Sequence, residues 1–159
     1  MNATQATYAR ITRRALENAL TAAGWTHTDG RHVGVRGGID TWTAPRRPGD
    51  VTKYRDMIQT FRNSRGQLTG AYLHTSLGDR FDFGGVLVGR AITDFLAGVR
   101  WRVTTHAAPY PYGRPCEGGS ITFPTRYAAE RHARAIGRDR SVSLCRVTPD
   151  GETGTISAV

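Results

Sequence analysis

Histidine is the side chain in this 159-residue sequence best suited to bind a metal or to move protons, and the chain has five. His27 and His32 flank Asp29-Gly30, a dipeptide that favours a two-residue hairpin turn and would set the two imidazoles opposite each other. Cross-strand neighbours have Cβ atoms about 5 Å apart, which suits a shared metal ion, but the spacing supplies no third ligand. We therefore expect two polar residues on an exposed hairpin and no metal site.

His74 offers a second arrangement, because Asp79 or Asp82 on the following strand can pair with it as a general-base dyad beside Ser76. No oxyanion loop accompanies these residues. The chain also lacks the GxxxxGKS, GxGxxG, GxSxG and HExxH motifs that mark common nucleotide, hydrolase and metalloprotease sites. We therefore expect neither an enzyme nor a bound cofactor.

Positive charge is the strongest compositional feature. The chain has 22 basic and 13 acidic side chains, a net charge of +9, and Lys53 is the only lysine. The basic residues are spread along the whole length without a basic tail, so folding must gather them into any anion-binding surface. Such a surplus attracts polyanions, which predicts nucleic acid, DNA ahead of RNA, or else an acidic protein as the partner.

A helix near the C-terminus, ending at Ile136 before Gly137, predicts one such surface. At 100° per residue, an aromatic ring and three guanidinium groups fall within an arc of about 60°. These residues are Tyr127, Arg131, Arg134 and Arg138. Small and apolar residues occupy the other side of the same helix, which indicates that the arginine stripe faces solvent.

The segment from about Lys53 to Arg65 predicts a second basic helix, since its apolar residues recur at helical spacing before Gly66. Arginine, glutamine and asparagine match the hydrogen-bonding pattern of base edges, and arginine also binds phosphates. The expected contact residues of this helix are Arg55, Gln59, Arg62, Asn63 and Arg65.

The stretch "AAPYPYGRPCEGGS", residues 107–120, has no apolar periodicity. Its prolines stiffen the chain and would display Tyr110, Tyr112 and Arg114 at a small entropic cost. Aromatic rings beside arginine suit stacking on bases or packing on a protein. The alternatives are an inert connector and a hinge between two folded pieces.

Hairpin signals and isolated helices alternate irregularly, which favours an α+β fold with a largely antiparallel sheet and three to four helices. We expect helices over about 8–23, 53–65 and 91–97, a last helix from near Pro124 to Ile136, and an irregular connection over 37–50. Strands are expected on both sides of a turn at Leu77-Gly78-Asp79 and over 99–105. A strand-helix-strand-strand unit ends the chain.

The length fits one domain over 1–159, with a possible subdivision into 1–106 and 119–159 joined by the Pro/Tyr/Gly-rich loop 107–118. No apolar run approaches the roughly 20 residues that span a bilayer. We expect a cytoplasmic protein with free thiols at Cys116 and Cys145.

These patterns favour a small nucleic-acid-binding regulatory or accessory protein, acting in replication, transfer or transcription of a mobile element such as a plasmid or phage. The alternative is an interaction module or inhibitor that binds an acidic protein through the same arginines. A helix-turn-helix is not expected, because a hairpin rather than a second helix follows the first helix. The aromatic strand motifs of RNA recognition domains are missing too.

Overall fold

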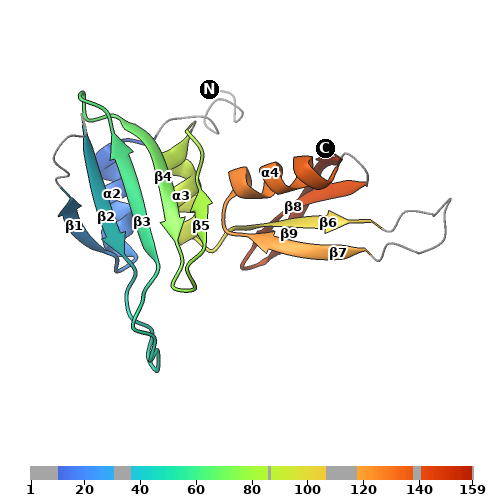
Figure 1. The fold of residues 1–159 in the computed structure, drawn as a ribbon, viewed down its shortest axis with the longest axis horizontal. Helices are drawn as coiled ribbons and strands as arrows, with labels where there is room; N and C mark the ends of the chain where they lie inside the picture. The colour runs from blue at the N-terminus through green and yellow to red at the C-terminus, as the bar shows by residue number, and fades with distance from the viewer. Residues whose placement is uncertain (1–10, 31–36, 86, 107–117, 138–140, 159) are drawn as a thin grey trace. The chain divides into compact units, whose positions relative to one another are not determined.

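The structure, a computed structural model, describes residues 11–30, 37–85, 87–106, 118–137 and 141–158. It confirms the α+β class: the described residues form two antiparallel sheets and three helices (Figure 1). The chain divides into two compact units, Met1–Leu96 and Ala97–Val159, each with a sheet and a core of its own.

Unit 1 contains a five-stranded sheet in which every strand pairs with its neighbour along the chain. Its strands are β1 (Thr26–Gly30), β2 (Gly38–Thr43), β3 (Met57–Arg62), β4 (Leu68–His74) and β5 (Arg80–Asp82). The predicted turn at Leu77-Gly78-Asp79 is confirmed between β4 and β5, where Gly78 has a φ of 94° and donates its N–H to the Thr75 carbonyl.

Two helices, α2 (Arg13–Ala22) and α3 (Val88–Leu96), cover one face of this sheet and lie behind it in Figure 1. Alternation along the strands points Trp42, Ile58 and Leu73 toward the helices, where they are buried. The helices contribute Leu16, Leu20, Val88, Ile92 and Phe95 to the same core. The opposite face, which we call the open face, is covered by neither of the two helices described in unit 1.

Three predictions for this unit are wrong. Asp29-Gly30 is no hairpin turn, because both residues lie in β1 and pair with Asp40 and Ile39 of β2. His27 therefore pairs with Trp42, and His32 lies outside the described residues. Residues 38–43 form β2 instead of an irregular connection, and the predicted helix over 53–65 is replaced by β3.

The last glycine of the stretch "GGVLVG" lies close to another segment of unit 1. Gly89 lies in the first turn of α3, where an added Cβ would come within 3.2 Å of Ile11 Cβ. The glycine thus lets α3 approach the residues that precede α2.

Unit 2 contains a four-stranded sheet in the order β7-β6-β8-β9. Its strands are β6 (Arg100–Thr105), β7 (Gly119–Phe123), β8 (Val142–Thr148) and β9 (Gly151–Ala158). Helix α4 (Arg126–Ile136) lies between β7 and β8, which confirms the strand-helix-strand-strand end of the chain. The strands on either side of residues 107–117 pair with each other, so both ends of that segment belong to unit 2.

Candidate nucleic-acid interface

Helix α4 ends at Ile136 as predicted and begins at Arg126, two residues after Pro124. Thr125 is the N-cap, its Oγ1 accepting the Ala128 N–H at 3.1 Å, and Gly137 follows the last turn with its N–H donated to Ala133. Ala129 and Ala133 are fully buried against the sheet, since only small side chains allow the helix to lie so close. This packing fixes which face of α4 remains in solvent.

That solvent face carries the predicted stripe. Tyr127 keeps 44% of its surface exposed, and Arg131 and Arg134 are both exposed. Neither guanidinium forms an ion pair with any carboxylate in the described part of the chain, whereas Arg126 of the same helix pairs with Glu130 at 2.6 Å. Arg131 and Arg134 are thus available to an external anion, and Arg138 lies outside the described residues.

The second predicted surface does not exist as a helix face. In β3, Gln59 and Phe61 point to the open face while Ile58 and Thr60 are buried beneath the helices. Gln59 and Arg62 therefore leave opposite faces of the sheet instead of sharing one side of a helix. The structure does not bring the five predicted residues together.

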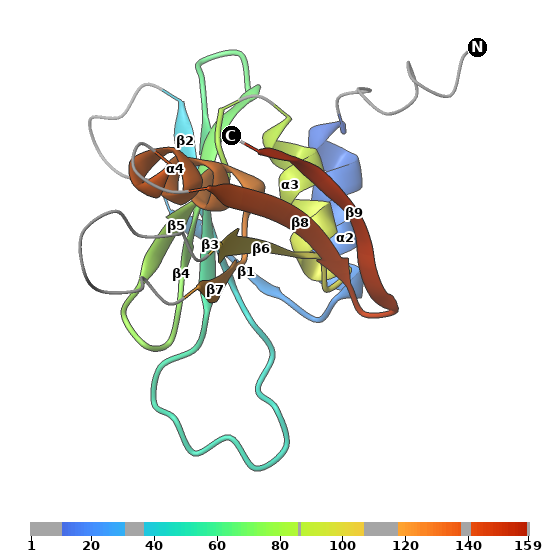
Figure 2. The same ribbon diagram turned by 90° about the vertical axis from the view of Figure 1, so that its right-hand side faces the viewer.

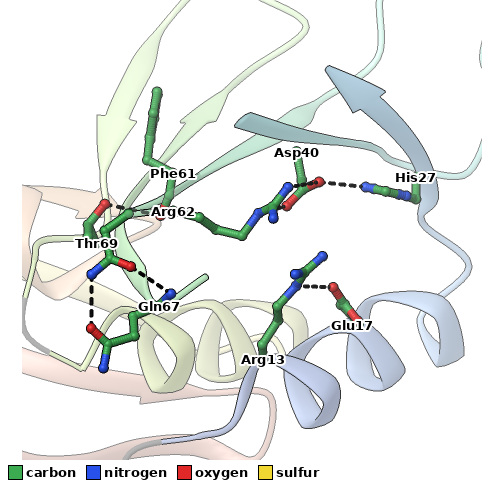
Figure 3. Close-up of polar contacts among 9 residues, drawn as sticks. Arg13, Glu17, His27, Asp40, Phe61, Arg62, Gln67 and Thr69 are labelled. Atoms are coloured by element: carbon green, nitrogen blue, oxygen red, sulfur yellow. Dashed lines mark hydrogen bonds and ion pairs between the residues drawn. The ribbon is translucent and has the colours of Figure 1, made fainter. Parts of the chain in front are cut away.

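Arg62 is held inside unit 1 by Asp40, whose side chain is only 5% exposed (Figure 3). Arg62 Nη2 donates to Asp40 Oδ1 at 3.0 Å, and Nε lies 2.6 Å from Oδ2 in an ion-pair contact without hydrogen-bond geometry. His27 Nε2 lies 3.0 Å from Oδ1 as well. Because a carboxylate already neutralises it, Arg62 is a structural residue and a poor ligand for phosphate.

The neighbouring residues of that predicted surface also have local partners. Asn63 Oδ1 accepts the backbone N–H groups of Arg65 and Gln67, which shapes the β3–β4 turn. Arg55 donates from Nη1 to the Ala44 carbonyl at 3.2 Å. Arg65 alone remains exposed at a turn, so these residues support the fold more than a common binding surface.

A second basic surface, missed in the sequence, is the connection between β2 and β3. It projects beyond the strands in Figure 1 and Figure 2. Arg46, Arg47 and Lys53 are exposed on it, and Tyr54 keeps 67% of its surface. Thr52 donates both its hydroxyl and its N–H to Asp50, and these bonds, ahead of the charges of Arg46 and Arg47, lower the Asp50 pKa.

The base of this connection is held in place. Ala44 donates its N–H to the Asp56 carbonyl at 2.9 Å, and the Asp56 side chain accepts the Ser76 N–H at 2.7 Å. No cation of the connection forms an ion pair with a carboxylate among the residues that the structure describes. The signal that could have located it is the run "PRRPGD", whose prolines prevent both helix and strand.

The open face of unit 1 carries aromatic rings and polar groups. The sequence did not predict this grouping, because residues 53–65 were expected to form a helix. Phe61 and Tyr72 lie side by side with ring centroids 5.5 Å apart, and Arg80 lies 4.7 Å above the Tyr72 ring. His74 Nε2 lies 3.0 Å from Gln59 Oε1. Burial, and after it the charge of Arg80, lowers the pKa of His74.

The remaining predicted residues include the His74 dyad and the residue types of a shared metal site. His74 pairs with Arg80 across the strands while Asp82 pairs with Tyr72, so the imidazole and the carboxylate are not opposite each other. Among the described residues, no three His, Cys, Asp or Glu side chains are grouped to hold a metal ion. Tyr110, Tyr112 and Arg114 lie outside the residues that the structure describes.

Comparisons with known proteins add nothing to this geometry. No protein-family model, curated protein or solved structure matches the chain. Over the described ranges, none of the helices combines the length and the apolar character that crossing a membrane requires.

Proposed function

We propose that this protein binds nucleic acid, DNA in preference to RNA, and acts as a small regulatory or accessory protein of a mobile element. The main support for the proposal is the solvent face of α4, where Arg131, Arg134 and Tyr127 are exposed. Neither arginine forms an ion pair with a carboxylate among the described residues. Guanidinium groups in this state bind phosphates without first breaking an internal ion pair.

The whole-chain charge and the β2–β3 connection support the same proposal. A net charge of +9 attracts a polyanion from a distance, and the projecting Arg46, Arg47 and Lys53 can follow a phosphate backbone. These contacts are to phosphate, so they supply affinity while carrying no information about base sequence.

The test replaces Arg131 and Arg134 together by glutamine and measures binding to a labelled DNA duplex over a range of salt concentrations. If both guanidiniums contact phosphate, affinity falls and the slope of log affinity against log salt becomes shallower by about 1.8. The matched control, Arg13→Gln with Arg102→Gln, removes the same charge from two arginines that are paired with Glu17 and Glu152.

The control variant should keep a slope close to that of the unaltered protein. An equal loss in both variants would mean that overall charge, and not α4, determines binding. Absence of any binding to DNA or RNA at low salt would refute the proposed function itself.

A second candidate function is binding to an acidic protein, and one observation favours it. Val51 is 95% exposed and Tyr54 67% exposed, both in the projecting β2–β3 connection, and exposed aliphatic and aromatic residues suit a protein interface. Capture of a protein partner from a nuclease-treated lysate, lost in a Val51→Ser/Tyr54→Ser variant, would support it.

A further inference from the structure

We propose that the open face of unit 1 binds single-stranded nucleic acid by stacking bases on Phe61 and Tyr72. The inference rests on the proposed function and deepens it, since it assigns the strandedness of the ligand and a second site. It is independent of α4, which belongs to unit 2.

Strand register places the two rings at the centre of the sheet. Phe61 of β3 pairs with Gly70 of β4, and Gln59 pairs with Tyr72, so the rings are diagonal neighbours on two adjacent inner strands. Their planes meet at 84°, and both rings are half-buried on a face that neither described helix of unit 1 covers. Aromatic rings displayed in this way are the usual platform for unpaired bases.

Gly70 leaves room for a base beside Phe61. A Cβ added at this glycine would meet no heavy atom within 4 Å, and Gly70 has no positive φ that would require glycine. Its bare backbone therefore supports no packing inside unit 1. A strand glycine of this kind marks a place where another group can approach closely.

Polar groups around the rings match the rest of a nucleotide. Gln59 Oε1 and His74 Nε2 lie 3.0 Å apart in a hydrogen bond, which leaves the Gln59 amide nitrogen and His74 Nδ1 to meet a base edge. Arg80 already lies 4.7 Å over the Tyr72 ring, where its guanidinium can also bind a phosphate. The nearby Asp82 carboxylate accepts the Gly84 N–H at 2.7 Å.

A duplex is a poor ligand for this face, because its bases are stacked on one another and expose only their edges. A protein partner is also disfavoured, since the polar residues Gln59, His74 and Thr41 lie among the apolar side chains of this face. Unpaired bases are the ligand that uses both the rings and the polar groups.

The experiment measures fluorescence anisotropy of three labelled probes with the full chain at low salt: a 12-nucleotide DNA strand, an RNA strand of the same sequence, and the DNA duplex. Tyr72→Leu removes one ring while keeping an apolar residue, and Gly70→Thr fills the space beside Phe61. Each should weaken single-strand binding about tenfold, the effect of losing one stacked base, and leave duplex binding unchanged.

Gly119→Thr is the matched control, because Gly119 is also a strand glycine with open space at its Cβ position. If single strands bind but Tyr72→Leu and Gly70→Thr bind them as tightly as Gly119→Thr does, the inference is overturned while the proposed function stands. If single-strand and duplex binding weaken equally, stacking is refuted. If the unaltered protein binds none of the probes, both proposals fail. A difference between the DNA and RNA strands would show which of them the face prefers.

Discussion

Replacing Asp40 by asparagine tests whether Arg62 is a structural residue. Asp40 is 5% exposed and Arg62 19% exposed, and Asn would leave the guanidinium without its counter-charge inside unit 1. Removing one partner of a buried ion pair costs about 3–5 kcal/mol. Because Arg62 keeps some contact with water, we expect the lower end, about 3 kcal/mol of unfolding free energy.

The double variant Asp40→Asn/Arg62→Met separates the ion pair from simple packing loss. It removes both charges, so we expect its loss of unfolding free energy to be about 2 kcal/mol smaller than the sum of the losses of the two single variants. The assay is urea denaturation followed by tryptophan fluorescence in a Trp101→Phe background, in which the remaining tryptophans, Trp25 and Trp42, both lie in unit 1.

With a urea m value of about 2 kcal/mol/M, the expected loss for Asp40→Asn moves the midpoint down by about 1.5 M. A loss below about 1 kcal/mol, the range of an exposed ion pair, would refute the burial argument. The Arg62→Met protein, kept below its unfolding transition, should bind DNA as the unaltered protein does. Weaker DNA binding by the folded variant would mean that Arg62 contacts DNA, which would contradict a purely structural role.

Two further predictions concern the same unit. Gly37→Ala should destabilise the protein by at least about 3 kcal/mol, because φ is +121° and the new Cβ would lie 1.8 Å from the Arg62 carbonyl oxygen. Gly49→Ala, at φ +80° with open space, should cost only about 1–2 kcal/mol in the same denaturation assay, and equal costs would contradict the close approach. The pKa of His74 is lowered in the folded protein, so the unfolded chain takes up a proton first as the pH drops below about 6.5, and stability falls. His74→Gln should therefore reduce the fall in thermal stability between pH 7 and pH 5. An unchanged pH dependence in that variant would show that His74 does not contribute.

The C-terminal unit could be predicted because its signals are local. In α4 the start signal Pro124, the small inward residues Ala129 and Ala133, and the following Gly137 all lie within one short stretch, and the helix begins just after Pro124. Helical periodicity then places Arg131 and Arg134 on one face with no tertiary information. The α+β class was predicted from local signals of the same kind, namely turn residues and isolated helical stretches.

The error at β3 has a physical reason. Met57, Ile58 and Phe61 satisfy helical spacing, while the strand buries Ile58 and Thr60, and Thr60 does not look like a core residue in sequence. β2 was missed for a similar reason, because Asp40 occupies an inward position. Its charge is balanced by Arg62, which is 22 residues away, so no local pattern reveals it.

The consecutive pairing of β1 to β5 has a consequence for how the chain folds. Each pair of neighbouring strands is joined by a short connection, so forming the pair costs little chain entropy. We therefore expect unit 1 to fold fast. All the residues of its core are synthesised by Leu96. On the ribosome, unit 1 can therefore bury its apolar surface before the strands of unit 2 are available to compete for it.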